Sequence, residues 1–250
     1  RKLVTRLYTK SQLVVAVTPN LMEILKQEGV ANVKLISNGA DVKKFKPLSS
    51  RKKNKSFTMV YSGNVGGYYA LDIVLKSMKK LVDRKLNDIK LIIAGGGEIE
   101  KVLNLAVDVG LSNNVEYRGA IKDKSELARL IAEADVGLIP YDDTPLWKNA
   151  YGTKVFEYCA CGIPVMATVY EDSILAKLIK KHKIGLVTPP LDAEALAVAL
   201  ENFFSDAKFR VEAGKNGRAL VVDQFNREKL AEELLKTLVK LHREQRSDIN

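Results

Sequence analysis

The chain has 250 residues, of which 46% are hydrophobic and 28% charged, and its formal net charge is +10. This length corresponds to about one and a half ordinary domains, and the composition excludes a disordered or fibrous chain. No run approaches the roughly 20 apolar residues that span a bilayer, and the basic N-terminal stretch lacks the apolar core of a signal peptide. We therefore expect neither a secreted nor a membrane-spanning protein.

Cysteine and histidine usage also narrows the function classes. Cys159 and Cys161 lie two positions apart in a segment with a helical pattern, where their side chains point to different faces. They are therefore not expected to form a disulfide bond, which favours a reducing, cytoplasmic environment. The two histidines, His182 and His242, stand in lysine-rich surroundings, so neither a histidine-based metal site nor a serine-type triad is expected.

The positive charge is spread along the chain. Lysine and arginine cluster at 43–46, 51–55, 79–85 and 177–183 and in the last predicted helix, without interleaved aromatic residues. This pattern argues against a nucleic-acid partner and is typical of a solvated surface. An anionic partner or a membrane surface remains the alternative interpretation.

In chain order, the first predicted unit is small. Residues 13–17 and 33–36 predict strands, and the helix between them is expected to begin at Thr18-Pro19 and to stop at Gly29. A single β-α-β unit of this size cannot bury its own faces.

A junction follows this unit. Asn38-Gly39 predicts a turn, and the polar, basic stretch 43–56 predicts a linker.

From residue 57 the sequence alternates short β-branched runs with amphipathic helical stretches. Strands are predicted at 57–61, 89–94, 115–118, 136–139, 164–167 and 185–188. Each run is continuous rather than alternating in polarity, which indicates strands covered on both faces. Six β-α units in series predict an α/β fold with a Rossmann-like doubly wound parallel sheet.

Helix boundaries fit this interpretation. Asp123 and Glu126 form a capping-box pattern, and Asp192 precedes an Ala/Leu-rich helical run. The last helix, predicted at 227–246, carries a stripe of leucines and therefore needs a surface on which to dock.

In an open parallel sheet, ligands bind beyond the carboxyl ends of the strands. Gly63, Asn64 and Gly66 lie in the loop after the first of the six strands, and Gly95 begins a glycine run after the second. Glycines there let backbone amides approach a phosphate, although a plain tight turn is the alternative. Neither loop matches the dinucleotide fingerprint, which argues against a nicotinamide cofactor.

The segment 149–165 is the strongest candidate site, because it leads from a loop into a short helix and then into a strand. Gly152 and Thr153 would present free amide groups to an anion at the helix N-terminus. Lys154 would neutralise a diphosphate, and Glu157 would accept hydrogen bonds from a vicinal diol such as ribose. The alternative is an exposed ion pair between the two, worth about 0.3 kcal/mol.

This segment also resembles the E-G-F-G-x-x-x-x-E-A-x-A-x-G-x-P-V signature of glycosyltransferase family 4, the retaining enzymes of the GT-B fold. Further segments resemble other motifs of that family in the same order. They are 36–41 with Phe45 and Pro47, 61–64, 93–97, 115–119 and 134–140.

The resemblance implies three parts of the chain. Residues 1–48 would be the remnant of an N-terminal acceptor domain with a linker, 49–225 a nucleotide-sugar donor-binding domain, and 226–250 a helix crossing back towards the N-terminal domain. The activity implied is that of a hexosyltransferase-type enzyme that moves a sugar from a nucleotide-sugar donor to an acceptor with retention of configuration. The acceptor would be a glycan or a lipid-linked molecule.

The resemblance further implies that no metal or other cofactor is needed. The catalytic groups would lie mostly on the N-terminal domain, so we expect the isolated chain to bind donor and to turn it over poorly or not at all. It implies a place in polysaccharide biosynthesis, in the cytoplasm or at the inner face of the membrane, with peripheral membrane association and no nucleic-acid partner.

Donor-binding residues follow from matching positions. Glu157 would bind the ribose hydroxyls, while Tyr151, Gly152 and Thr153 would hold the diphosphate and sugar. The other predicted donor-binding residues are Gly63, Asn64, Gly66, Gly95, Ala120, Ile121, Asn149 and Lys154, with Ala120 and Ile121 against the base.

Three positions depart from the family pattern. Asn149 replaces the first glutamate of the pair, so its contact to the sugar hydroxyls would be neutral or absent. Asn64 and Tyr69 occupy the positions of the two cations that neutralise the diphosphate. We therefore expect Lys154 to take over that role.

Other functions stay open at this point. A non-catalytic nucleotide-binding or regulatory module with the same fold is the main alternative, and Asn149 supports it. An epimerase of the same architecture would need acid and base groups that the sequence does not place. A dehydrogenase is weakened by the missing fingerprint.

Overall fold

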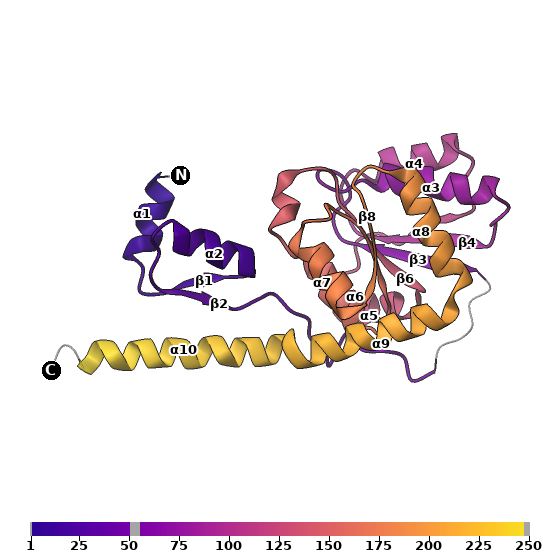
Figure 1. Ribbon diagram of the computed structural model, residues 1–250. Coiled ribbons are helices and arrows are strands. Elements are labelled where there is room, and N and C mark those ends of the chain that lie inside the picture. The colour runs from indigo at the N-terminus through magenta and orange to yellow at the C-terminus, as the bar shows by residue number, and fades with distance from the viewer. Residues whose placement is uncertain (1, 51–55, 248–250) are drawn as a thin grey trace.

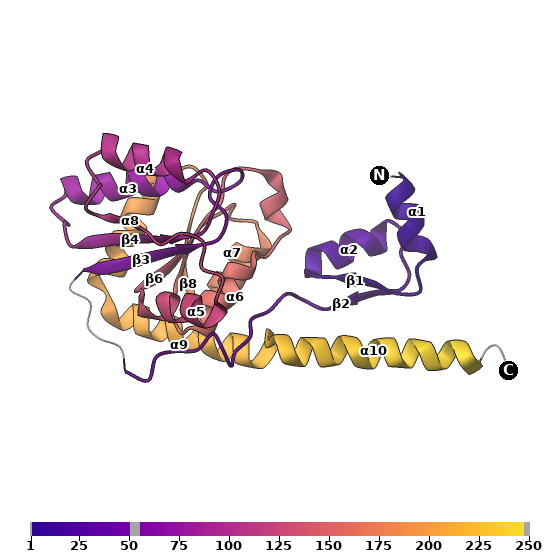
Figure 2. The same ribbon diagram turned by 180° about the vertical axis from the view of Figure 1, so that it is seen from behind.

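The computed structural model describes residues 2–50 and 56–247; residues 51–55 of the predicted linker lie outside the described residues. The chain forms a large lobe around one sheet and a small lobe near the N-terminus (Figure 1). A long C-terminal helix leaves the large lobe and runs along the small one, as the views from both sides show (Figures 1 and 2).

The large lobe is built on a six-stranded parallel sheet with the strand order β5-β4-β3-β6-β7-β8. Its strands are β3 (Phe57–Ser62), β4 (Ile89–Ala94), β5 (Val115–Tyr117), β6 (Val136–Pro140), β7 (Val165–Thr168) and β8 (Gly185–Thr188). The order reverses between β3 and β6, so the connections wind in opposite directions from this point. The predicted doubly wound parallel sheet is confirmed.

Helices cover both faces of this sheet. They are α3 (Leu71–Asp83), α4 (Ile99–Asp108), α5 (Lys124–Glu133), α6 (Thr153–Ala160), α7 (Ile174–His182), α8 (Ala193–Ser205) and α9 (Ala207–Gln224). Helices α3, α4 and α8 enclose one core, and α5, α6, α7 and α9 contribute to the other. In β3, Met59 and Tyr61 enter the first core whereas Val60 enters the second, which explains why the run is apolar throughout.

The predicted caps at Asp123 and Asp192 are present, but among the described residues no hydrogen bond from Glu126 completes the predicted capping box. The side chain of Asp123 accepts a hydrogen bond from the Ser125 amide at 2.8 Å. Asp192 accepts one from the Ala195 amide, also at 2.8 Å. Each carboxylate satisfies an amide that has no partner within its helix.

Helix α9 was not predicted, because small residues rather than an apolar stripe form its contact face. A Cβ on Gly214 would lie 2.1 Å from the Gly162 carbonyl oxygen, and one on Gly217 would lie 2.9 Å from the sulfur of Cys159. Both cysteines, Cys159 and Cys161, are buried, and burial raises the pKa of each thiol to about 12.

The small lobe contains α1 (Lys2–Lys10), β1 (Val14–Ala16), α2 (Pro19–Gln27) and β2 (Val33–Leu35). The two strands pair in parallel, and the predicted strand, helix and strand are present. Helix α1 was not predicted. Helix α10 (Arg227–Ser247) attaches to this lobe through Lys34, whose ammonium lies 3.0 Å from a Glu233 carboxylate oxygen and donates to Thr237 Oγ1 at 2.7 Å.

Within the described part of the chain, no helix combines the length and the apolarity needed to cross a membrane.

The chain passes between the lobes twice, and the two passages are bonded to each other. The Ala40 amide donates to the Phe225 carbonyl and the Arg227 amide to the Ala40 carbonyl, each at 3.0 Å. A Cβ on Gly39 would lie 2.2 Å from the Phe225 carbonyl oxygen, so this close approach requires glycine.

Arg218 fastens the first passage to the large lobe. Its guanidinium donates to the carbonyl oxygens of Phe45 and Ala160 at 2.8 Å and to that of Val42 at 3.2 Å. The Ala160 carbonyl belongs to the last turn of α6, so one side chain binds the junction and the end of that helix together.

We expect Arg218→Met to lower the free energy of unfolding by about 2 kcal/mol, because three carbonyls lose charge-assisted hydrogen bonds. Urea denaturation followed by circular dichroism measures this. Lys215→Met is the matched control on the same helix, since Lys215 is exposed, and it should change stability by less than about 0.5 kcal/mol. Equal effects of the two substitutions would contradict the anchoring role.

Candidate functional site

The loops after β3, β4 and β5 lie against one another at the carboxyl edge of the sheet. The Gly63 amide donates to the Ala94 carbonyl at 2.9 Å, and the Gly95 amide donates to the Gly119 carbonyl at 2.8 Å. A Cβ on Gly95 would lie 1.7 Å from the Gly63 carbonyl oxygen. Backbone contact of this kind requires glycine, so the two predicted glycine loops form one surface.

The remaining predicted residues of these loops occupy different places. Gly66 has a φ of 97° and lies against the side chain of Glu98. Asn64 contributes its carbonyl to the Tyr61 hydroxyl. Ala120 is exposed, and Ile121 is half-buried against the core that includes α6.

Helix α6 is held directly on the sheet. A Cβ on Gly137 in β6 would lie 2.3 Å from the ring of Tyr158, so the ring occupies the space that any other residue would fill. The Tyr158 hydroxyl accepts a hydrogen bond from the Ser62 amide at 2.9 Å. These contacts place the N-terminus of α6 where the strand order reverses, between β3 and β6.

The first turn of α6 carries amides without a side-chain cap. Gly152, at the N-cap, has extended backbone geometry and no side chain with which to cap the helix. A Cβ on Gly152 would lie 2.0 Å from the hydroxyl oxygen of Tyr141, which explains the glycine. The turn can therefore offer N–H groups and the positive end of the helix dipole to an anion.

Lys154 is buried on this turn, with 8% of its surface exposed. Its ammonium lies 4.0 Å from the centre of the Tyr69 ring and 5.3 Å from that of Tyr61. A Cβ on Gly63 would lie 2.8 Å from the ammonium nitrogen, so the lysine spans from α6 to the loop after β3. Within the described residues, no carboxylate oxygen lies within 4.0 Å of this nitrogen.

Burial lowers the pKa of Lys154 to about 8, and the charge of Glu157 opposes this shift only in part. The exposed Lys154–Glu157 ion pair that was the alternative interpretation is not formed. Glu157 is also buried, and its carboxylate lies 3.6 Å from the ammonium of Lys124 at the start of α5.

Sequence reasoning missed the aromatic cluster next to the Tyr69 ring that Lys154 contacts. Tyr141 stacks on Trp147 with ring centres 3.7 Å apart, and Tyr69 lies 5.7 Å from Tyr141. Trp147 belongs to a short 3-10 helix, η1 (Pro145–Lys148), that was not predicted. Tyr141 directly follows β6 and lies two positions after the end of the predicted strand, and an aromatic residue near the carboxyl end of a strand was the available signal.

Asn149 lies at the contact between the lobes. Its side-chain oxygen accepts a hydrogen bond from the amide of Asn20 at 2.9 Å, and its carbonyl accepts one from the Thr18 hydroxyl at 3.0 Å. Thr18 is buried and also caps α2 by accepting from the Leu21 amide. The residue that replaces a glutamate of the family pattern therefore joins the loop before α6 to the small lobe.

The site thus combines uncapped amides, one buried ammonium and one buried carboxylate along a single helix. The amides and the ammonium suit a phosphate or diphosphate, and the carboxylate suits a pair of hydroxyls. No group of three His, Cys, Asp or Glu residues in the described ranges is arranged to hold a metal ion.

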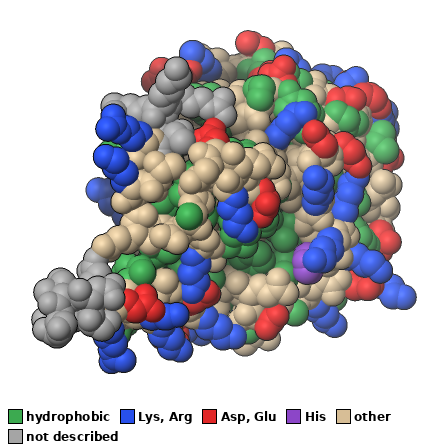
Figure 3. All heavy atoms as spheres, turned by 60° about the vertical axis from the view of Figure 1, so that its left-hand side comes forward, with side chains coloured by type: hydrophobic (Ala, Val, Ile, Leu, Met, Phe, Trp, Pro, Cys, Tyr) green, Lys and Arg blue, Asp and Glu red, His purple; other side chains and the backbone are tan. Residues whose placement is uncertain are grey.

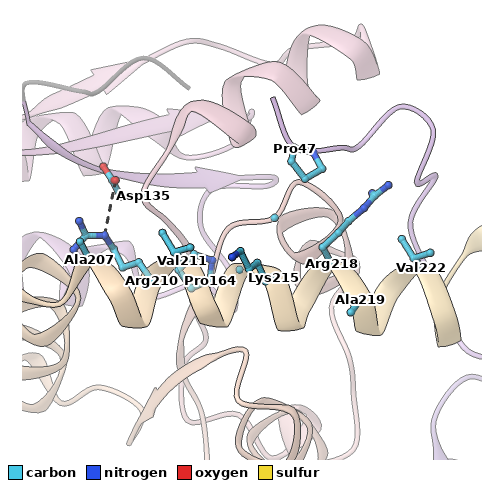
Figure 4. A pocket seen from close by; sticks show the side chains of 12 residues that line it. Pro47, Asp135, Pro164, Ala207, Arg210, Val211, Lys215, Arg218, Ala219 and Val222 are labelled. Atoms are coloured by element: carbon cyan, nitrogen blue, oxygen red, sulfur yellow. Dashed lines mark ion pairs between the residues drawn. The ribbon is translucent and has the colours of Figure 1, made fainter. Parts of the chain in front are cut away.

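Another groove lies at the opposite edge of the sheet (Figure 4). It measures about 580 Å³ and runs along α9, beside Asp135 and Pro164, which precede β6 and β7. Its arginines are already engaged: Arg210 lies 4.0 Å from the Asp135 carboxylate, and Arg218 binds three carbonyls. The groove lies away from the strand carboxyl ends and does not offer a comparable anion site.

Comparison with known proteins identifies the family of the chain. Residues 42–220 match the sequence profile of the family described as Glycosyl transferases group 1. A D-inositol 3-phosphate glycosyltransferase from Corynebacterium jeikeium is 27% identical over 200 residues, which cover 73% of this chain and 46% of that protein. The chain spans about half of the length of the curated relatives that it matches.

Solved structures show the same fold. Sucrose-phosphate synthase from Thermosynechococcus elongatus has a TM-score of 0.80 and 23% identity, over 96% of this chain and 61% of that chain. HepE from Anabaena in complex with UDP-glucose has a TM-score of 0.78 and 17% identity, over 96% of this chain and 67% of that chain.

We expect Lys154→Met to raise the free energy of unfolding at pH 7 by about 2 kcal/mol, because it removes a buried ammonium that has no carboxylate partner. The folded-state pKa of Lys154, about 8, lies below the ordinary lysine value of 10.5, so between these values the unfolded chain binds more protons and wild-type stability rises with pH. The advantage of the variant should therefore shrink from about pH 8 to pH 10.

Urea denaturation at several pH values measures this difference. Lys76→Met is the control, because the Lys76 side chain is half-exposed on α3 and pairs with Asp72. A Lys154→Met variant whose stability follows the wild-type pH profile would show that the ammonium is not destabilised by burial.

Proposed function

Because the chain belongs to the Glycosyl transferases group 1 family, we propose that it is the donor-binding half of a retaining glycosyltransferase of family 4. The donor is a nucleotide-activated sugar, bound at the carboxyl ends of β3, β4 and β6. The observation that carries this proposal is the buried Lys154 ammonium, which stands beside the uncapped N-terminus of α6 with its charge uncompensated by a close carboxylate.

The donor diphosphate occupies the first turn of α6 in this proposal. The amides at Gly152 and Thr153 donate to its oxygens, and Lys154 neutralises its charge from the side of Gly63. The same groups then stabilise the charge that develops on the diphosphate as it leaves the sugar. Tyr69 occupies a position where the family pattern has a cation. The Lys154 ammonium lies over the ring of Tyr69.

The nucleoside lies towards α5. Glu157 accepts hydrogen bonds from the two ribose hydroxyls. Lys124, 3.6 Å from its carboxylate, leaves oxygen lone pairs available. The half-buried Ile121 and the neighbouring Ala120 border the base. HepE, which shares this fold, was solved with UDP-glucose, and this supports a nucleoside diphosphate sugar as the ligand class.

The proposed reaction needs no metal ion, because the amides and Lys154 supply the positive charge. The acceptor is a glycan or a lipid-linked molecule, handled in the cytoplasm or at the inner face of the membrane. A lipid-linked acceptor is named in one relative, the GDP-mannose-dependent monoacylated alpha-(1-6)-phosphatidylinositol monomannoside mannosyltransferase from Corynebacterium glutamicum, and this supports the proposal. We propose that residues outside this chain contribute the binding site for the acceptor and the remaining catalytic groups.

A non-catalytic nucleotide-binding module is the second candidate, and the engagement of Asn149 favours it. The side-chain oxygen that would face sugar hydroxyls accepts from Asn20 instead. Donor hydrolysis or sugar transfer, measured for the chain joined to its complementary half, separates an enzyme from a binding module.

We expect one class among UDP-, GDP- and ADP-sugars to raise the melting temperature of the chain. At about 100 times its dissociation constant, a ligand adds roughly 2.7 kcal/mol to the stability of the folded state. Lys154→Met should lower the affinity for that donor at least about tenfold at pH 7 in titration calorimetry, while Lys76→Met should leave the affinity unchanged. Wild-type affinity should fall as the pH rises above about 8, and the variant should lose this dependence. Unchanged affinity in Lys154→Met would overturn the role of the lysine.

The ribose contact has a separate test. Removing both ribose hydroxyls from the nucleotide should weaken binding to the wild type by about tenfold, since two hydrogen bonds to a carboxylate are lost. Glu157→Gln should lower the affinity for the intact nucleotide. Removal of the ribose hydroxyls should then change the affinity of this variant little. Additive effects of the two changes would place the ribose elsewhere.

A further inference from the structure

A second groove, of about 380 Å³, lies where the small lobe meets the large one. Its walls come from the start of α2, the segment after β2, helix α7 and the end of α9. Its floor is apolar, formed by Leu35, Tyr151, Ile174, Leu178 and Phe225. The space-filling view of this side of the molecule shows apolar side chains in a hollow with lysine and arginine around it (Figure 3).

The rim of the groove is cationic. Lys177 and Lys181 are one turn apart on α7 and both exposed, and the neighbouring His182 is half-buried. No carboxylate lines this groove, and among the described residues no carboxylate oxygen lies within 4.0 Å of the Lys177 or Lys181 ammonium. By contrast, Lys180 on another face of α7 is paired with Glu171.

Nearby acidic residues do not compensate this charge. The carboxylate of Asp172 is paired with Lys148 at 2.9 Å, and this hydrogen bond is the main cause that lowers its pKa, to which the charge of Lys177 adds a smaller contribution. Lys177 and Lys181 therefore present a local positive field to the groove, at a place where the apolar floor excludes water from one side.

The groove also contains a polar group without a partner. The hydroxyl oxygen of Ser37 is buried and makes no hydrogen bond with the described residues. A buried hydroxyl of this kind destabilises the fold unless a ligand or water satisfies it. It lies in the lining with the first residues of α2, Pro19 and Asn20, where the positive end of that helix dipole is located.

We infer that this groove binds a single phosphate-bearing amphiphile, a lipid with an anionic phosphate head group. The phosphate lies between Lys177, Lys181 and the start of α2, and the first carbons of the chains lie on Leu178 and Phe225. The apolar floor distinguishes this ligand from free phosphate, and the cationic rim distinguishes it from a neutral or zwitterionic lipid.

This inference goes beyond the donor site and does not depend on it. The two sites share Tyr151 but use different cations: Lys154 faces the loop after β3, whereas Lys177 and Lys181 face the small lobe. A variant could lose donor binding and keep lipid binding, or lose lipid binding and keep donor binding. Separate titrations with each ligand therefore distinguish the two proposals.

The test uses dihexanoyl phosphatidic acid below its critical micelle concentration, titrated into the whole chain in a calorimeter. We expect saturable binding to one site. The double variant Lys177→Gln/Lys181→Gln should weaken it about tenfold, because two charge-assisted contacts are lost. Lys180→Gln is the matched control from the same helix and should change the affinity less than about twofold. All three lysines are exposed, and equal melting temperatures of the variants would confirm that they fold alike.

Two further ligands separate the sources of the phosphate chemistry. Inorganic phosphate should bind at least about tenfold more weakly, because it leaves the apolar floor uncovered. Dihexanoyl phosphatidylcholine should also bind at least about tenfold more weakly, because its ammonium group neutralises the head group. Equal affinity for inorganic phosphate, equal affinity for the choline lipid, equal losses in the double variant and Lys180→Gln, or no saturable binding would each overturn the inference.

Discussion

The close seat of α6 on the sheet is the constraint on which the rest of the site depends. Gly137 in β6 admits the ring of Tyr158 from one side, and Gly217 in α9 admits Cys159 from the other. A larger residue at either glycine would push the helix away from its neighbours. Because α6 is fixed on both sides, its N-terminus lies at the point where the strand order reverses, beside the loops after β3 and β4.

The position of α6 determines where the positive charge of the site comes from. The loop after β3 has no cation of its own, and the ammonium that reaches it belongs to Lys154 on the helix. Holding that charge over Tyr69 and Tyr61 in a buried place costs stability, which the lowered pKa of Lys154 expresses. An anion bound there would recover this cost, so the same feature that destabilises the empty fold favours a phosphate ligand.

The sheet could be predicted from sequence because its strands are buried on both faces, as the apolar run at 57–61 shows. Helix α9 could not, because its contacts are made by glycines such as Gly217 that leave no apolar stripe. Lys154 and Glu157 lie in one helix, as the sequence predicts, but the partner of each is set by tertiary packing. Glu157 meets Lys124 rather than Lys154, and Asn149 meets a residue of the small lobe.

The burial of Cys159 and Cys161 has a practical consequence. Both thiols remain protonated near neutral pH, since burial raises the pKa of each to about 12, and maleimide reagents attack the thiolate. A cysteine introduced on an exposed face of the large lobe or of the small lobe would therefore be the fast-reacting position in the folded chain. Fluorescent dyes can thus be placed on each lobe with the native cysteines intact, and energy transfer between them would report how the lobes move about the bonded passages at Ala40 and Arg227.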